Sequence, residues 1–103
     1  MKNIKNMKKQ PKDHSPKLSI LVPVYNVSAY LSLCLDSIMN QSFSDFECIL
    51  INDGSTDFSL SILKSYVKQD PRFRLISHKN SGYGASLNKG IKLAKGEYIG
   101  IVE

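Results

Sequence analysis

The chain has 103 residues, enough for one small domain or for part of a larger one. Its hydrophobic fraction of 42% is typical of a globular chain. No apolar run approaches the roughly 18 residues that a membrane-spanning helix needs. The formal net charge of +5 comes from the first 17 residues, because residues 18–103 carry as many basic as acidic side chains. A neutral globular part argues against a nucleic-acid-binding surface built into the fold.

Residues 1–17 are rich in lysine, show no apolar periodicity and contain Ser15-Pro16, so we expect a solvated basic tail before a domain at residues 18–103. No apolar segment follows the lysines as it would in a secretory signal, and we therefore expect a cytoplasmic protein. The charge of the tail leaves two alternatives open: contact with the cytoplasmic face of an anionic membrane, and binding of RNA. RNA binding is the less favoured of the two, and we therefore predict no nucleic-acid partner.

From residue 18 onward, strand-like apolar runs alternate with segments of helical periodicity. The expected strands are residues 18–22, 46–51, 73–76 with an end near His78, and 98–102. The expected helices are one capped by Ser28 and closed by Gln41-Ser42, one through Leu60, Leu63 and Val67 that stops at Asp70-Pro71, and one through Leu87, Ile91 and Ala94 that stops at Gly96. The order βαβαβαβ predicts an α/β fold, a Rossmann-like parallel sheet with helices on both faces.

Two loops at the carboxyl ends of the first two strands carry side chains suited to recognition. Tyr25 and Asn26 follow the first strand, and Asp53-Gly54-Ser55 follows the second. In an open parallel sheet such loops converge on one crevice, where ligands bind. An aromatic ring can stack on a base while a carboxylate accepts a hydrogen bond from its N–H edge. The alternative is that Asp53 only organises its own turn and Asp57 only caps the next helix.

The common phosphate-binding loops and catalytic patterns are absent from the sequence. The position of a G-x-G-x-x-G fingerprint, directly after the first strand, is occupied by residues 23–26, and no GxxxxGK[ST] occurs. Gly82-Tyr83-Gly84 has two of the glycines but follows the third strand. His78 has no partner at the spacing of a nucleophilic triad, and we interpret it as a satisfied loop histidine.

Several motifs occur in register along the whole domain. They are Leu18-Ser19-Ile20-Leu21-Val22-Pro23-Val24-Tyr25-Asn26, Tyr30-Leu31, Cys34-Leu35-Asp36-Ser37-Ile38, Gln41-Ser42-Phe43, Asp45-Phe46-Glu47, Ile51-Asn52-Asp53-Gly54-Ser55-Thr56-Asp57 and Ala94-Lys95-Gly96-Glu97-Tyr98-Ile99. Together they resemble the start of a family 2 glycosyltransferase, from about Lys17 to Glu103. The resemblance implies a GT-A fold, in which a Rossmann-like nucleotide-binding half precedes an acceptor half, and a nucleotide-sugar donor that is often a UDP-sugar.

Carried over position by position, the resemblance implies a nucleoside site. The ring of Tyr25 would lie near the base, Asp53 would accept the base N–H, and Gly54-Ser55 would shape the adjoining turn. The substrate-binding residues implied in this way are Pro23, Val24, Tyr25, Asn26, Asp53, Gly54, Ser55, Asn80, Gly82 and Asn88, with a helix start near Asn88.

The sequence departs from the family pattern at Ser86-Leu87-Asn88, where family members usually show Ala-Arg-Asn. The charge contact that the arginine makes with the donor therefore needs another source. Lys79 and Lys89 are the candidates, and for each the alternative is a solvated surface lysine.

The resemblance also implies a divalent metal, Mn²⁺ or Mg²⁺, held by a D-x-D type motif after the fourth strand. Glu103 stands at the first acidic position and the second acid is absent, so only a partial metal position is expected here and a complete site belongs to a full-length enzyme. The family's catalytic base, a carboxylate in inverting members, lies outside these residues as well. No catalytic residue is therefore assigned.

The sequence thus predicts the N-terminal part of an inverting glycosyltransferase. It would transfer a sugar from a UDP-sugar to a saccharide or lipid-linked acceptor, and these residues by themselves would be inactive. The alternative is a non-catalytic nucleotide-binding or assembly module that self-associates through the open sheet edge at residues 98–102.

Overall fold

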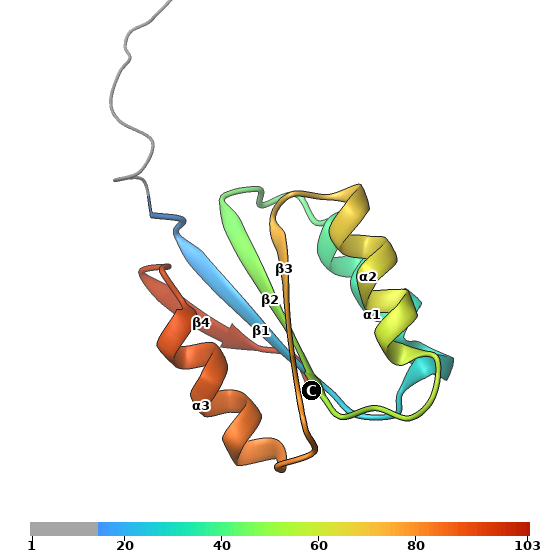
Figure 1. Ribbon diagram of the computed structural model, residues 1–103. Helices are drawn as coiled ribbons and strands as arrows, with labels where there is room; N and C mark the ends of the chain where they lie inside the picture. Colours follow the sequence, from blue (N-terminus) through green and yellow to red (C-terminus); the bar gives the residue numbers. More distant parts are fainter. Residues whose placement is uncertain (1–14) are drawn as a thin grey trace, which may run out of the picture.

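The computed structural model describes residues 15–103, so residues 1–14 of the tail predicted at residues 1–17 lie outside the described residues. The elements are β1 (Leu18–Val24), α1 (Ser28–Met39), β2 (Phe46–Asp53), α2 (Ser59–Gln69), β3 (Phe73–His78), α3 (Tyr83–Leu93) and β4 (Tyr98–Ile101). The strands form one parallel sheet in the order β3-β2-β1-β4. Helices α1 and α2 cover one face of the sheet and α3 covers the other (Figure 1).

The α/β fold with a parallel βαβαβαβ sheet is confirmed. Strands β1 and β2 run beyond their predicted ends, because their pairing continues through Pro23 with Ile51 and Val24 with Asn52. Those added residues carry both strands to the edge from which the two predicted recognition loops leave. The order of the strands places β1 and β2 side by side at the centre, so the two loops leave the sheet as neighbours.

The core has one layer on each face of the sheet. Every residue of β2 is buried, which is typical of a central strand covered on both sides. The layer under α1 and α2 includes Leu35, Leu50 and Leu63, each fully buried. The layer under α3 is smaller and consists of buried Leu21, Ile49 and Ile51, with Ile76, Leu87 and Ala94 packed against them.

The start of α1 differs from the prediction that Ser28 caps it. Ser28 is the first helical residue, and the capping position is held by Val27, which makes no side-chain capping hydrogen bond. The Oδ2 of Asp57 instead accepts a hydrogen bond from the Ser28 N–H at 3.1 Å, while its Oδ1 accepts one from the Ser59 N–H at 2.8 Å. These contacts lower the pKa of Asp57 to about 2 against the opposing effect of desolvation. One carboxylate from the β2–α2 loop therefore serves the first turns of two helices.

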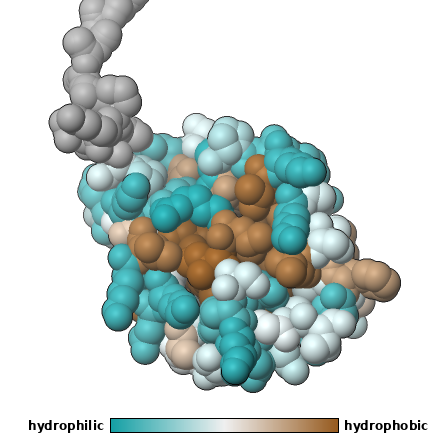
Figure 2. Space-filling model, viewed as in Figure 1, coloured by the Kyte–Doolittle hydropathy of each residue, from teal (hydrophilic) through white to brown (hydrophobic). Residues whose placement is uncertain are grey.

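The two edge strands of the sheet reach the surface. Figure 2 shows an apolar surface between the helix layers, on the side from which β3 faces the viewer in Figure 1. At the opposite edge, β4 exposes Tyr98, Ile99 and Ile101 by 61, 44 and 43%. Pro16 and Lys17, just before β1, already accept hydrogen bonds from the N–H groups of Glu97 and Tyr98. Within residues 15–103, no helix has the length and apolarity that crossing a membrane requires.

Candidate functional site

A pocket of about 260 Å³ opens at the carboxyl edge of the sheet, between the ends of β1 and β2 and the start of α3. We call it the carboxyl-edge pocket, and its lining residues are Pro23, Val24, Tyr25, Asp53, Asn80, Gly82, Tyr83 and Ser86. Tyr25 and Asp53, the aromatic and acidic residues that the sequence singled out, therefore lie on one shared pocket. Tyr25 is 50% exposed and Asp53 is 4% exposed, so the ring stands at the opening and the carboxylate lies inside.

The carboxylate of Asp53 holds the loop between β3 and α3. Its Oδ1 accepts a hydrogen bond from the Ser81 N–H at 2.7 Å, and its Oδ2 accepts one from the Gly82 N–H at 3.0 Å. The Asn80 side-chain amide donates to the backbone carbonyl of Asp53 at 3.0 Å. Asp53 thus organises a loop distant in sequence rather than only its own turn. The same Asn80 amide lies 3.5 Å from Oδ2, and Oδ1 has one short hydrogen bond and can accept a further one, so this role leaves room for ligand recognition.

Two glycines permit the close fit of this loop. Gly54 has φ 71°, and a Cβ at this position would lie 2.5 Å from the backbone nitrogen of Asn80. Gly82, the residue before α3, has φ 98°. Both are backbone conformations that a side chain disfavours, so these two predicted site residues shape the pocket through their backbones.

Asn26 ties the β1–α1 loop to the β2–α2 loop. Its Oδ1 accepts hydrogen bonds from the N–H groups of Thr56 at 2.8 Å and Asp57 at 3.3 Å, and its own N–H donates to the Ser55 Oγ at 3.1 Å. Asn26 has φ 50°, a conformation that asparagine tolerates better than most residues. Asn26 and Ser55 do not line the carboxyl-edge pocket, and the structure gives them a scaffolding role beside it.

A buried histidine lies beneath the pocket. The Nε2 of His78 is 3.2 Å from the Oγ of Ser86 and 3.7 Å from the Oδ1 of Asp53, and the His78 side chain is 9% exposed. Both contacts involve the same ring nitrogen, whereas a nucleophilic triad uses one nitrogen for the serine and the other for the acid. The predicted satisfied loop histidine has these partners, but it is the last residue of β3 rather than a loop residue, because the β2–β3 pairing continues to Asp53 and His78.

Helix α3 begins earlier than the sequence indicated, and Asn88 does not line the carboxyl-edge pocket. The helix starts at Tyr83 rather than near Asn88, so Asn88 is exposed within the helix and does not line the pocket. Leu87, at the position of the family's arginine, packs against the core layer under α3. Lys79 and Lys89 are exposed.

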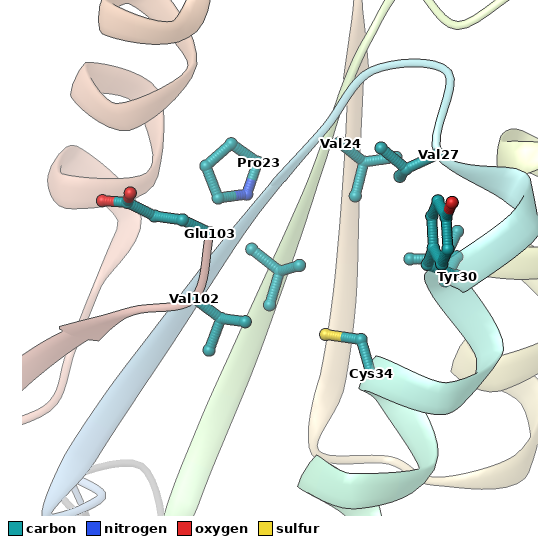
Figure 3. Close-up of a pocket in the computed structure, with 9 residues that line it drawn as sticks. Pro23, Val24, Val27, Tyr30, Cys34, Val102 and Glu103 are labelled. Carbon is teal, nitrogen blue, oxygen red and sulfur yellow. The ribbon is translucent and has the colours of Figure 1, made fainter.

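A second hollow, of about 290 Å³, lies at the same edge of the sheet on the α1 side. We call it the α1-side hollow, and its lining residues are Val22, Pro23, Val24, Val27, Tyr30, Leu31, Cys34, Val102 and Glu103 (Figure 3). Its walls are apolar apart from Glu103, whereas the carboxyl-edge pocket has Asp53, Asn80 and Ser86. In Figure 3 the Glu103 side chain points away from the hollow, toward α3. The polar groups that a nucleobase requires are therefore found in the carboxyl-edge pocket.

The described residues do not form a complete metal site. No group of three or more His, Cys, Asp or Glu side chains in residues 15–103 is placed to hold a metal ion. Glu103 is a single carboxylate, and a hard divalent cation requires several oxygen ligands in fixed geometry. The described residues therefore do not fit a metal by themselves.

Sequence reasoning missed two lining residues, Tyr83 and Ser86. Tyr83 was read only as part of a weak glycine pattern, although an aromatic residue directly after Gly82 at the carboxyl end of the third strand is a signal for a pocket wall. Ser86 is fully buried beneath the pocket, and no local pattern distinguishes it from the other serines.

The parallel α/β sheet and the polar pocket at its carboxyl edge are typical of open α/β proteins, which bind ligands at the carboxyl ends of their strands. The family description "Glycosyl transferase family 2" matches residues 19–103, and the chain belongs to this family.

Three similar proteins show the extent of the likeness. The putative glycosyltransferase EpsH of Bacillus subtilis (strain 168) is 45% identical over 89 residues, which are 86% of this chain and 26% of EpsH. The crystal structure of S. aureus TarS 1-349 in complex with UDP is 32% identical with a TM-score of 0.77, covering 84% of this chain and 26% of that one. The chain thus spans about a quarter of the length of these relatives.

The third is the mannosyltransferase PcManGT from Pyrobaculum calidifontis, solved in complex with GDP-Man and Mn²⁺. It has a TM-score of 0.75 at 24% identity, covering 84% of this chain and 27% of its own. This likeness shows the fold, which matches the N-terminal part of GT-A structures.

Proposed function

We propose that residues 18–103 form the nucleotide-sugar-binding part of an inverting, metal-dependent glycosyltransferase that uses a UDP-sugar and a saccharide or lipid-linked acceptor. The observation that carries the proposal is the shared pocket of Tyr25 and Asp53 in a chain of the glycosyltransferase 2 family. The half-exposed ring offers a stacking face, and the buried carboxylate offers an acceptor for a base N–H.

The UDP-sugar is proposed because uracil carries an N3–H from which a carboxylate such as that of Asp53, which lines the pocket, can accept a hydrogen bond. The complex of TarS with UDP supports the same choice, since TarS shares this fold at 32% identity. In the proposal the acceptor half, the catalytic base and the remaining metal ligands lie outside these residues. We therefore expect no sugar transfer from the 103-residue chain.

We propose that the enzyme acts in the cytoplasm and makes a peripheral contact with the cytoplasmic face of the membrane. The six lysines among the first 17 residues support that contact, because they would be attracted to anionic lipid. Vesicle co-sedimentation with and without anionic lipid tests it, and equal pelleting on both vesicle types would contradict it.

Titration calorimetry of the chain with uridine and with UDP tests the proposed nucleoside site. We expect binding of both, and Tyr25→Ala should weaken it by about fivefold or more, because base stacking on an aromatic ring contributes about 1–3 kcal/mol. Asp53→Ala should weaken it by about tenfold or more, since it removes a hydrogen bond to a charged group.

Two controls separate recognition from folding in this experiment. Glu97→Ala removes one negative charge at the opposite edge of the sheet, where the side chain pairs with exposed Lys17, and should leave binding unchanged. Tyr25→Ala removes an exposed ring and should leave the thermal midpoint nearly unchanged. Absence of uridine binding in the wild-type chain, or equal binding by the Asp53→Ala variant, would reject the proposal.

A specific observation favours a second candidate, an assembly module that pairs through β4. This strand lies at an edge of the sheet and exposes Tyr98, Ile99 and Ile101, and an exposed apolar edge recruits a second strand. Sedimentation velocity tests this candidate against the concentration of the chain. A dimer that Ile99→Lys converts to monomer supports it, and a monomer at all concentrations would reject it.

A further inference from the structure

Tyr83 connects two parts of the carboxyl edge that the sequence places far apart. It is the first residue of α3, it is 50% exposed, and it lines the carboxyl-edge pocket. Its hydroxyl donates a hydrogen bond to the Oε2 of Glu103 at 3.0 Å.

The backbone of Tyr83 is held in place from the pocket side. The preceding residue, Gly82, donates its N–H to the Oδ2 of Asp53 at 3.0 Å, and its carbonyl accepts the Ser86 N–H at 3.1 Å. The start of α3 is therefore fixed to the end of β2. Because Tyr83 is the first residue of α3, its backbone has a fixed position, and its side chain lines the pocket.

Glu103, by contrast, follows the least supported strand of the sheet. Strand β4 pairs with β1 only and ends at Ile101, and the last backbone contact before Glu103 is the hydrogen bond from the Val102 N–H to the Leu21 carbonyl at 2.9 Å. Among the described residues, the hydroxyl of Tyr83 is the hydrogen-bond partner of the Glu103 carboxylate. Figure 3 shows the result, a side chain that points away from the α1-side hollow and toward α3.

We propose that Tyr83 is a positioning residue that holds the Glu103 carboxylate at the rim of the carboxyl-edge pocket. The proposal rests on the proposed function, because it assigns a role within the same nucleoside site. The ring and the hydroxyl have separate tasks: the ring walls the pocket, and the hydroxyl sets the direction of the carboxylate. A carboxylate held there can accept a hydrogen bond from a hydroxyl group of the bound ligand.

A double-mutant cycle with uridine as the ligand tests this role. Tyr83→Phe keeps the ring and Glu103→Gln keeps the shape of the acid, and each should weaken uridine binding by about three- to tenfold, the size of one hydrogen bond. The double variant should bind no more weakly than Glu103→Gln, because Tyr83 acts through Glu103. Additive losses, or wild-type affinity in the Tyr83→Phe variant, would overturn the proposal.

A second measurement reads the contact without any ligand. In NMR spectra of the chain with ¹³C-labelled tyrosine rings, Glu103→Gln should change the chemical shifts of the Tyr83 ring and leave those of the Tyr25 ring unchanged. Tyr98→Phe, which removes a hydroxyl at the other end of the sheet, is the matched control and should leave uridine affinity unchanged. A wild-type chain that binds no uridine overturns the proposed function and this role with it, whereas uridine binding with an unmoved Tyr83 signal overturns only the role of Tyr83.

Discussion

Glu47 and Asp53 lie at opposite ends of β2, on the face of the sheet that α3 covers. Both carboxylates are buried, with 8 and 4% exposure, and both accept hydrogen bonds from backbone N–H groups next to α3. Asp53 holds the residues before the helix, and Glu47 holds Lys95 after it. The two acids thus fasten the two ends of α3 to the same strand.

The surroundings of the two carboxylates differ. Glu47 lies among an arginine and the neighbouring strands: Oε2 accepts hydrogen bonds from the Ser19 hydroxyl and the Lys95 N–H, both at 2.6 Å, and Oε1 pairs with Arg74 at 3.1 Å. Asp53 receives its two short hydrogen bonds from a loop, and its carboxylate lines a pocket. The two carboxylates are therefore similarly buried but have different roles. A carboxylate that pairs with an arginine between neighbouring strands supports the fold, and one that borders a pocket is placed to bind a ligand.

The largest expected effect is that of Glu47→Ala. It leaves the Lys95 N–H and the Ser19 hydroxyl without their acceptor and removes the carboxylate that pairs with Arg74, and we expect a loss of about 3 kcal/mol in the free energy of unfolding. Urea denaturation measures it. Uridine affinity of the folded protein should change little, because the pocket lies at the other end of the strand.

The control for Glu47→Ala is Glu97→Ala, which removes an exposed acid near the same end of the sheet and should stay within about 0.5 kcal/mol of the wild type. Equal stability of the two variants would contradict the stabilising role of the buried Glu47 carboxylate.

The next effect in size concerns the loop that Asp53 holds. Gly54→Ala places a side chain at φ 71° and 2.5 Å from the Asn80 backbone nitrogen, so we expect a loss of about 2 kcal/mol in the free energy of unfolding. Gly84→Ala is the matched control. Gly84 lies in α3 and has open space where a Cβ would lie, so alanine there should stabilise the protein by up to about 1 kcal/mol. Urea denaturation of both variants checks the pair, and a loss at Gly84 equal to that at Gly54 would contradict the assignment.

Asp53→Asn tests whether the carboxylate, rather than its shape, fastens the start of α3. An amide has one acceptor oxygen, so one of the N–H groups of Ser81 and Gly82 loses its partner, and we expect a loss of about 1–2 kcal/mol. Hydrogen exchange of these two amides should accelerate, while that of the Lys95 amide at the Glu47 end should not. Unchanged exchange at both Ser81 and Gly82 would contradict the role of Asp53.

The difference between the two ends of β2 also shows what the sequence could predict. The strands and helices follow from local patterns: the run through Ile49, Leu50 and Ile51 identifies a central strand without any knowledge of its neighbours. The convergence of Tyr25 and Asp53 on one pocket follows from the general geometry of parallel sheets.

The remaining features depend on contacts between distant residues. Serine is a good capping residue, so Ser28 was the natural prediction, but the Asp57 carboxylate from the next crossover takes that position. The early start of α3 depends on Asp53 holding Gly82, and this brings in Tyr83 and excludes Asn88 from the pocket. No local pattern contains such information, because the donor and the acceptor belong to different loops.

The smallest expected effect is the dependence of the Glu47 contribution on pH. Desolvation raises the pKa of Glu47, but the hydrogen bonds from Lys95 and Ser19 and the pairing with Arg74 together hold it below its ordinary value. The folded chain therefore binds this proton at lower pH than the unfolded chain does. The stabilisation is fully present above the ordinary glutamate pKa of about 4.3 and is lost as the pH falls below it, through the folded pKa.

Glu47→Gln isolates this contribution. The amide oxygen can still accept from Lys95 and Ser19, but the pair with Arg74 is lost, so the variant should be less stable than the wild type by about 1 kcal/mol at pH 7. The difference should shrink as the pH is lowered toward 3, because the wild-type carboxylate then becomes protonated too. Asp57 and Asp70, whose pKa values are also lowered, are present in both proteins and cancel in the comparison. Urea denaturation at pH 7 and near pH 3 measures the difference, and a gap that stays constant would show that the charge of Glu47 contributes nothing to its hold on α3.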